Sequence, residues 1–352
     1  MGRSVDGVVL DRVVRLCSAA LDARTLRLEL LAEFGRVVGF DAYAWLLTDP
    51  ETSVGSAPLA DVPCLPELPR LIRLKYLTPV NRWTGLPAGG VASLLAATSG
   101  DRPRSRVWRE LLAGHEVADV LSVVFRDPYG CWGFLDLWRI GAAAPAFSGR
   151  EAGFLAEVVP AVTAAARRAQ AATFTSTPEG RPPGPVVLLL SSELSLLAQT
   201  PQTDAYLREL VPPEGGAAPV PAGAYNVGAQ LLAIEAGVDG NPPVARVHLR
   251  AGQWLSLRAA RLAETSTAST GAIAVTIEPA SPEERRALFC RSCALTRRET
   301  ELVGHLATGG DTRDVAHRMG LSEHTVQDHL KSVFTKTATR SRRDLLARIT
   351  GS

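Results

Sequence analysis

Residues 321–334 read LSEHTVQDHLKSVF, and this stretch decides how the C-terminal part of the chain is interpreted. Val326, Leu330 and Val333 recur at the spacing of one buried face of an α-helix. Ser322 stands where a hydroxyl can cap the first turn. The opposite face carries His, Gln, Asp and Lys. An ordinary amphipathic surface helix would show the same pattern. The neighbouring segments therefore have to show whether the polar face of this helix has a further role.

Three further helices are predicted around this one. Thr296 and Glu299 form a T-x-x-E capping box that opens the first, and Asp311 caps the short helix TRDVAHRM. Gly320 supplies a tight turn, and the fourth helix begins at Ser341. Two short helices joined by a Gly-containing turn predict a helix-turn-helix unit. Its second helix would enter a major groove of DNA.

Residues 295–349 resemble the LuxR-type (GerE-like) DNA-binding domain nearly end to end. The residues that carry the resemblance are Leu295-Thr296, Arg298-Glu299, Gly309, Val315-Ala316, Gly320, Ser322, Thr325-Val326, His329, Lys336, Arg340-Ser341-Arg342 and Leu345. The resemblance implies that one group of side chains holds the DNA phosphates and another faces the base edges. The predicted phosphate contacts are Thr325, Lys336, Arg340 and Arg342. The predicted base-reading residues are His324, Gln327, Asp328 and Lys331.

The chain departs from the commoner family pattern at position 327, where Lys is frequent. Gln327 can pair with N6 and N7 of adenine, Asp328 can accept from N4 of cytosine, and Lys331 can donate to guanine. A carboxylate at position 328 would be repelled by the phosphates. It therefore either reads a base amino group or orients Lys331 or His324, and the sequence leaves both interpretations open.

The distribution of charge agrees with a DNA-binding C-terminal domain. Residues 291–352 hold eleven Lys or Arg and seven Asp or Glu, an excess of four positive charges, whereas the whole chain has a net charge of only +2. A positive excess confined to one domain is expected for a phosphate-binding module. A solvated basic surface would look similar, so this evidence is weak by itself.

The chain is long enough for two or three domains, with 352 residues of which 46% are hydrophobic. A Pro- and Gly-rich stretch over 174–184 predicts a linker. The segment EPASPEERRALFCRSC predicts a second joint, in which Ser281, Pro282 and Glu284 signal the start of a helix. The predicted domains are 1–172, 185–280 and 291–352. No apolar run approaches the length of a membrane helix, so we expect a cytoplasmic protein with reduced cysteines and no membrane partner.

The order of elements in the first predicted domain resembles a GAF-type sensor. Helical stretches precede the extended run 40–50, a β-hairpin is predicted over 117–140, and the segment 148–169 closes the domain as a helix. The arrangement is similar to that of actinobacterial regulators that pair GAF-like domains with the LuxR-type module. In the second domain two strands, two helices and three antiparallel strands resemble a PAS-like fold. Such fold-level likeness says little about function.

Aromatic residues in the first domain could line a pocket for a small molecule, although such residues are more often core. The candidates are Trp45, Tyr76, Trp83, Trp132 and Trp138. The identity of a ligand, and whether one exists, is left open.

Other chemistry finds little support in the sequence. Cys290 and Cys293 have motif spacing, but His305 and His317 lie outside the usual spacing of zinc ligands, so no metal site is predicted. The two cysteines are either a redox switch or incidental thiols. No nucleophile elbow, P-loop, zinc-protease motif or dinucleotide fingerprint is present, so we predict no catalytic residues, no enzyme activity and no cofactor.

The sequence as a whole predicts a multidomain α+β protein, with GAF-like and PAS-like antiparallel-sheet domains followed by an all-α four-helix LuxR-type domain. The expected function is sequence-specific binding of double-stranded DNA as a transcriptional regulator, as a homodimer, modulated by a ligand or partner at the N-terminal domains. The alternative is a signalling adaptor whose sensor domains bind protein partners.

Overall fold

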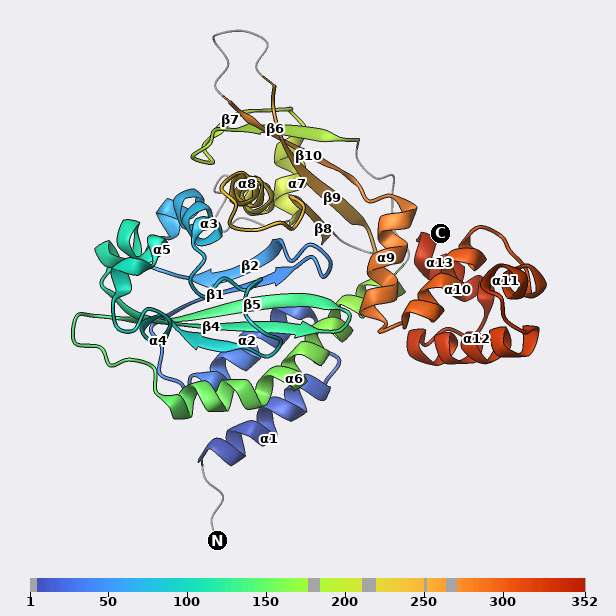
Figure 1. Ribbon diagram of the computed structural model, residues 1–352, viewed down its shortest axis with the longest axis horizontal. Helices are drawn as coiled ribbons and strands as arrows, with labels where there is room; N and C mark the ends of the chain where they lie inside the picture. The colour runs from blue at the N-terminus through green and yellow to red at the C-terminus, as the bar shows by residue number, and fades with distance from the viewer. Residues whose placement is uncertain (1–4, 177–183, 211–219, 250–251, 264–270, 352) are drawn as a thin grey trace.

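The computed structural model describes residues 5–176, 184–210, 220–249, 252–263 and 271–351, shown in colour in Figure 1. The predicted linker 174–184 lies mostly outside these residues, as do the first four residues of the predicted first domain and residue 352. None of the helices formed by the described residues is long and apolar enough to cross a membrane.

The first unit is a five-stranded antiparallel sheet in the order β2-β1-β5-β4-β3, with helices on both faces (Figure 1). The predicted hairpin over 117–140 forms β4 and β5. One face packs on α1, α2 and α6 through a core that includes Leu30, Leu135 and Val158. The larger elements are α1 (Val5–Ser18), α2 (Ala23–Phe34), β1 (Ala42–Thr48), β2 (Gly55–Asp61), α3 (Leu68–Leu77), β3 (Val91–Ser93), α4 (Leu94–Ala97), α5 (Arg106–Glu110), β4 (Val117–Asp127), β5 (Gly130–Ile140) and α6 (Gly149–Ala172).

The second unit is another five-stranded antiparallel sheet, in the order β7-β6-β10-β9-β8. Counted along the chain, each sheet places its strands in the order second, first, fifth, fourth, third. The prediction of two antiparallel sheets is confirmed. The elements are β6 (Val186–Leu190), β7 (Leu196–Gln199), α7 (Thr203–Leu210), α8 (Ala222–Glu235), β8 (Val244–His248), β9 (Trp254–Arg261) and β10 (Ile273–Pro279).

Helix α8 lies between the two sheets and packs on both (Figure 1). It contacts α3 and β2 of the first unit and β9 of the second. Its sequence is apolar nearly all round, as expected for a helix buried on several sides. Val227 and Ala229 belong to the same core as Tyr76 and Phe134 of the first unit. The two units therefore share one continuous hydrophobic core.

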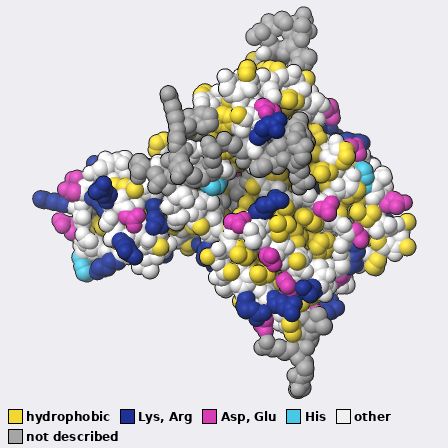
Figure 2. All heavy atoms as spheres, turned by 180° about the vertical axis from the view of Figure 1, so that it is seen from behind, with side chains coloured by type: hydrophobic (Ala, Val, Ile, Leu, Met, Phe, Trp, Pro, Cys, Tyr) yellow, Lys and Arg dark blue, Asp and Glu magenta, His cyan; other side chains and the backbone are white. Residues whose placement is uncertain are grey.

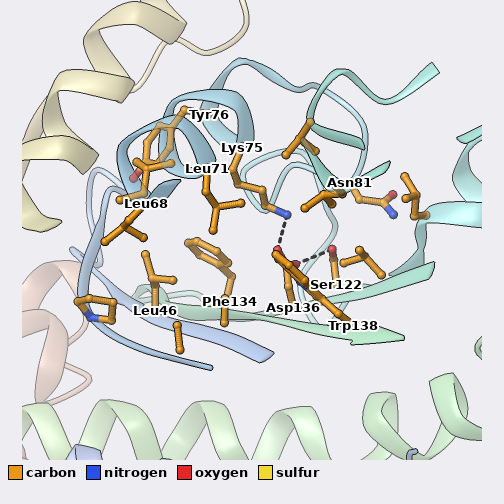
Figure 3. Close-up of a pocket in the computed structure, with 18 of the residues that line it drawn as sticks. Leu46, Leu68, Leu71, Lys75, Tyr76, Asn81, Ser122, Phe134, Asp136 and Trp138 are labelled. Atoms are coloured by element: carbon orange, nitrogen blue, oxygen red, sulfur yellow. Dashed lines mark hydrogen bonds and ion pairs between the residues drawn. The ribbon is translucent and has the colours of Figure 1, made fainter. Parts of the chain in front are cut away.

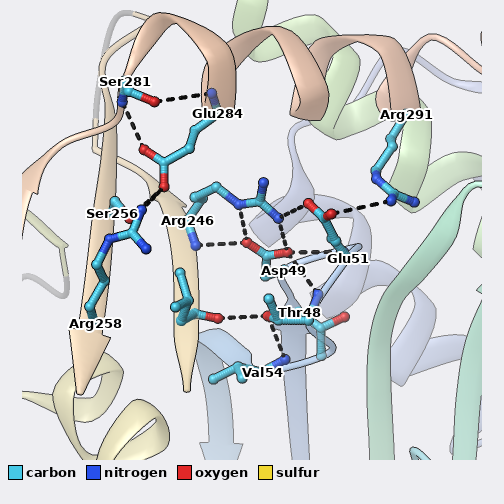
Figure 4. A network of polar contacts seen from close by, with 12 residues as sticks. Thr48, Asp49, Glu51, Val54, Arg246, Ser256, Arg258, Ser281, Glu284 and Arg291 are labelled. Carbon is cyan, nitrogen blue, oxygen red and sulfur yellow. Dashed lines mark hydrogen bonds and ion pairs between the residues drawn. The ribbon is translucent and has the colours of Figure 1, made fainter. Parts of the chain in front are cut away.

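Two buried ion pairs also join the first two units. Arg246 of β8 donates through Nε and Nη2 to the two carboxylate oxygens of Asp49, at 2.6 Å each, and both side chains are almost fully buried (Figure 4). Burial alone would lower the pKa of Arg246, but the hydrogen bonds and charge of Asp49 outweigh it and the pKa is raised. The second pair joins Arg82 to Asp239 at 2.8 Å. Charges buried this deeply are stable only with such partners.

The C-terminal domain is a bundle of five helices whose common core includes Leu302, Val315, Val326 and Leu345. The three helices predicted to begin at Thr296, Asp311 and Ser322 each begin with that side chain as an N-cap. Their bounds and those of their neighbours are α9 (Pro282–Ser292), α10 (Arg297–Ala307), α11 (Thr312–Met319), α12 (Glu323–Thr337) and α13 (Arg342–Thr350). The helix α9 begins at the capping signal predicted at Ser281, Pro282 and Glu284, and it shares this core as a fifth helix beside the expected four.

One arginine fastens the C-terminal domain to both sheet units. Arg285 of α9 is buried and donates to the carbonyls of Ile349 at 2.9 Å and of Gly252. Its guanidinium stacks over the ring of Phe174, just after α6, at 4.9 Å. Phe174 in turn stacks on Trp254 of β9, with ring centroids 5.2 Å apart. The end of the first unit, the second sheet and the C-terminal domain therefore meet at this junction.

Candidate nucleic-acid interface and ligand cavity

Helix α12 presents a polar face to solvent. Val326, Leu330 and Val333 are buried against α10 and α11, as their spacing predicts. The predicted base-reading residues lie on the other side, where the side chains of His324 and Lys331 are 85% and 74% exposed. Gln327 is also exposed, and Figure 1 shows α12 along one edge of the domain. The face expected to enter a major groove is therefore accessible in the folded chain.

Asp328 lies between Lys331 and His324 on this face. Lys331 Nζ lies 3.1 Å from one carboxylate oxygen and His324 Nε2 lies 3.6 Å from the other. The hydrogen bond and charge of Lys331 lower the pKa of Asp328, with smaller contributions from His324 and His329. The structure thus contains the pairing of Asp328 with Lys331 and His324 that the sequence left as one of two alternatives.

The predicted phosphate contacts differ in the exposure of their side chains and in the hydrogen bonds that they already make. Thr325 Oγ1 lies 2.9 Å from Ser322 Oγ at the start of α12, and the Arg340 side chain is exposed. Arg342 is half-buried and donates to the carbonyl of Gly310, which joins α13 to the loop before α11. On the face of the molecule in Figure 2, Lys and Arg side chains of this domain are interspersed with Asp and Glu. On this face the cations of the domain are therefore scattered and not gathered in one patch.

Lys336 has a partner that the sequence analysis did not assign to it. Its Nζ lies 2.7 and 3.0 Å from the two carboxylate oxygens of Glu299, whose side chain is only 4% exposed. Ser332 Oγ also donates to this carboxylate, at 2.6 Å. Burial alone would raise the pKa of Glu299, but the hydrogen bonds from Lys336, Ser332 and Thr296 lower it to about 2. Glu299 therefore does more than complete a capping box, because it also ties α10 to α12.

The five aromatic residues predicted as pocket candidates occupy three different environments. Trp45 stacks on Phe125 in the core beneath the first sheet, and Trp83 stacks on Phe134 and donates to the carbonyl of Ser53. Two of the five, Tyr76 and Trp138, line a cavity on the opposite face of the sheet. Trp132 lines a larger cavity of about 730 Å³ between α6 and the second sheet. Tyr76 and Trp138 are thus the two of the five that line the same cavity, and Trp83 packs edge-on against Tyr76, with ring centroids 4.9 Å apart.

The cavity lined by Tyr76 and Trp138 has a volume of about 80 Å³ and lies between the first sheet and α3 (Figure 3). Its lining is apolar except for a few side chains. Lys75 Nζ lies 2.7 Å from Asp136 Oδ2, and Ser122 Oγ donates to Asp136 Oδ1 at 2.7 Å. Sequence reasoning missed these three residues. A single carboxylate within the apolar strand CWGFLDLWRI was the available signal, because a buried carboxylate needs a partner.

Cys290 and Cys293 are poorly suited to nucleophilic or redox chemistry. Cys290 is buried and Cys293 half-buried, and burial raises the pKa of each thiol to about 12, so both are protonated near neutral pH. Among the described residues, no group of three or more His, Cys, Asp or Glu could hold a metal ion.

The comparison with known proteins concerns the C-terminal domain. Residues 293–349 match the family described as bacterial regulatory proteins, luxR family. The match starts at the end of α9 and runs to the last turn of α13, so it covers the predicted helix-turn-helix. No curated protein was found to be similar to the chain. Residues 293–349 therefore form a LuxR-type helix-turn-helix domain, the domain of DNA-binding transcriptional regulators.

Proposed function

We propose that the chain is a dimeric, sequence-specific transcriptional regulator, that His324, Gln327, Asp328 and Lys331 of α12 read base edges, and that a ligand at the N-terminal units modulates the binding of DNA. The observation that carries the proposal is the accessible polar face of α12 within a LuxR-type domain. Amide, carboxylate and ammonium groups on one groove-facing surface suit the donor and acceptor pattern of the major groove. Thr325, Lys336, Arg340 and Arg342 are the proposed phosphate contacts.

We assign the first unit to the GAF-like class and the second to the PAS-like class of sensor folds. The support is the order of elements and the shared strand order of the two sheets. A cavity on the sheet face of the first unit suits a sensor, because ligand sites are concave and mostly apolar with a few polar groups. The shared core and the junction at Arg285 give a continuous packed route from that cavity to the DNA-binding domain.

Dimer formation is proposed because a single helix-turn-helix reads few base pairs, and two-fold sites need two copies. The outer face of α13 is the proposed contact, with the Ala-rich part of α6 as a second seam. In the folded chain α13 also packs on α9. Pairing would therefore use the part of α13 around Arg343 and Leu346, which α9 leaves exposed or half-buried.

The test of DNA reading is selection of bound duplexes from a random pool by the purified full chain, followed by affinity measurements over a range of salt concentrations. A regulator should enrich one related set of sites, and its affinity should fall steeply with salt because counterions are released from the phosphates. A signalling adaptor would enrich no site and would show a flat response to salt.

A further inference from the structure

The 80 Å³ cavity is closed by residues from both sheet units. The first sheet, α3 and the segment around α5 form most of the wall, with Leu71, Val107 and Phe134 among the apolar residues. Ala222 and Asn226 at the start of α8 complete it from the second unit. A molecule in this cavity would therefore touch both units at once.

Three residues that line the cavity each have a buried side-chain atom without a hydrogen-bond partner among the described residues. The atoms are Ser105 Oγ, Trp138 Nε1 and Asn226 Oδ1, and each of the three residues is at most 2% exposed. The amide nitrogen of Asn226 does have a partner, because Nδ2 donates to the carbonyl of Ala222 at 2.8 Å. Buried polar groups are nearly always paired, so three unpaired atoms around one cavity point to a ligand with polar groups of its own.

The charges in the cavity cancel one another. Lys75 and Asp136 form a close ion pair, and Ser122 donates to the same carboxylate (Figure 3). A charged ligand would find no opposite charge that is not already paired, and it would lose its hydration in an apolar surrounding. The unpaired atoms instead offer a donor at Trp138, an acceptor at Asn226 and a hydroxyl at Ser105, which suit a neutral molecule.

We propose that this cavity binds a small neutral molecule with an apolar body and a carbonyl or hydroxyl oxygen. That oxygen accepts a hydrogen bond from the indole N–H of Trp138. The inference deepens the proposed function, on which it rests, by naming the chemical class of the ligand. Because Asn226 belongs to α8, the bound molecule stabilises the packing of the second unit on the first. The cavity volume is about half of the ~150 Å³ that holds benzene, so the ligand is smaller than benzene and has only a few heavy atoms.

The direct test uses four molecules of four heavy atoms each, which differ in head group and charge. Acetone, 2-propanol, acetate and isopropylammonium are titrated into the full chain without DNA, and binding is followed by saturation-transfer NMR. The ketone and the alcohol should bind, and both ions should bind at least tenfold more weakly. Tightest binding of the carboxylate or the ammonium ion would overturn the proposal, and so would binding of none of the four.

Two substitutions of matched chemistry locate the site. Trp138→Phe keeps a ring and removes the N–H, and should weaken binding of the ketone about three- to tenfold, the value of one neutral hydrogen bond. The control is Trp254→Phe, which also removes a buried, unpartnered indole N–H but lies on the larger cavity. The control should bind the ketone as the unaltered chain does. Weakening by Trp254→Phe alone would place the molecule in the larger cavity and contradict the proposal.

A variant of Trp138 that fails to fold is recognised by its loss of cooperative unfolding, and Ser105→Ala then serves as the second probe of the same wall. It should weaken binding of 2-propanol, which can both donate and accept a hydrogen bond, more than that of acetone, which can only accept one, and equal effects on both would count against the assignment. Because these measurements contain no DNA, failure to bind the probes is distinguishable from failure to select duplexes.

Discussion

Lys336 and Glu299 form an ion pair, with 2.7 Å between Nζ and Oε2, that joins α12 to α10. The carboxylate is buried and the ammonium half-buried, so the pair contributes to the stability of the domain itself. Lys336 was predicted from the sequence as a phosphate contact, and that role stays a prediction. Its substitution would change both folding and DNA affinity, and the two effects have to be measured separately.

Lys336→Ala should lower the free energy of unfolding of the C-terminal domain by about 1–3 kcal/mol, because Glu299 is left buried without its cation. Affinity should fall alike for all duplex sequences. The control is Arg340→Ala, which removes an exposed cation and should weaken DNA binding without changing stability. Hydrogen exchange of the amides of α10 and α12, together with duplex titrations, checks both variants. Unaltered exchange in Lys336→Ala would contradict the structural role.

The same carboxylate predicts sensitivity to acid. The pKa of Glu299 falls from its usual value of 4.5 to about 2 in the folded chain. A lowered folded-state pKa stabilises the fold above pH 4.5, and this contribution, on the order of 3 kcal/mol, is lost as the pH falls from 4.5 towards 2. Calorimetry of the unaltered chain and of Glu299→Gln over this range checks it. The variant should start less stable and lose less, and parallel curves would refute the assignment.

Substitutions on the exposed face of α12 should alter which base is preferred. Gln327→Ala and Lys331→Ala should each change discrimination at one position of the site by about 1–3 kcal/mol. Asp328→Asn should act through Lys331, because it removes the charge that holds the ammonium group. Repeated selection from a random duplex pool measures the preference. The same enriched sites for the parent and for both alanine variants would show that another surface reads the bases.

The buried pair between the two sheet units should be sensitive to removal of one partner. Asp49→Ala should cost about 3 kcal/mol of unfolding free energy, since it leaves most of the charge of Arg246 uncompensated in the interior. Glu51 contacts the same guanidinium at 2.9 Å but is about half exposed, so Glu51→Ala is a matched control expected to cost less than about 1 kcal/mol. Denaturant unfolding compares the two. Equal losses would mean that burial does not decide the strength of this interaction.

Assembly on DNA can be decided by ultracentrifugation with a duplex that carries a single selected site. We expect two chains for each duplex at saturation, on an inverted repeat. Arg343→Glu, on the exposed part of α13, should weaken the two-to-one complex and leave the fold intact. A saturating one-to-one complex of the unaltered chain would exclude a dimeric site.

The sequence predicted local structure well because caps, apolar periodicity and turn residues act over a few neighbours. The helices that begin after Thr296, Asp311 and Ser322, and the hairpin of β4 and β5, follow from such signals. The polar face of α12 was predicted for the same reason.

Contacts between distant segments were beyond these signals. Lys336 and Glu299 are 37 residues apart, and Asp49 and Arg246 are 197 apart, so no local pattern pairs them. The cavity was missed because Lys75, Asp136 and Asn226 come from three separate elements that meet only in the packed core. The sequence alone does not distinguish Trp45 and Trp83 from Trp138. Only the fold shows which aromatic residues lie in the core and which line the cavity.

The burial of α8 between the two sheets has a consequence for recombination of this chain with others. A chimaera cut within the predicted linker 174–184 would carry the first sheet without α8, and would expose Ile72, Tyr76 and other residues of the shared core to water. A transplant of the first 280 residues would keep that core whole, but would still cut the contacts of Arg285 with Phe174 and Gly252. A crossover after α9 would keep those contacts but would separate α9 from the core that it shares with α10–α13 and Arg285 from the carbonyl of Ile349. The C-terminal domain is therefore expected to be a poor candidate for exchange as an independent module.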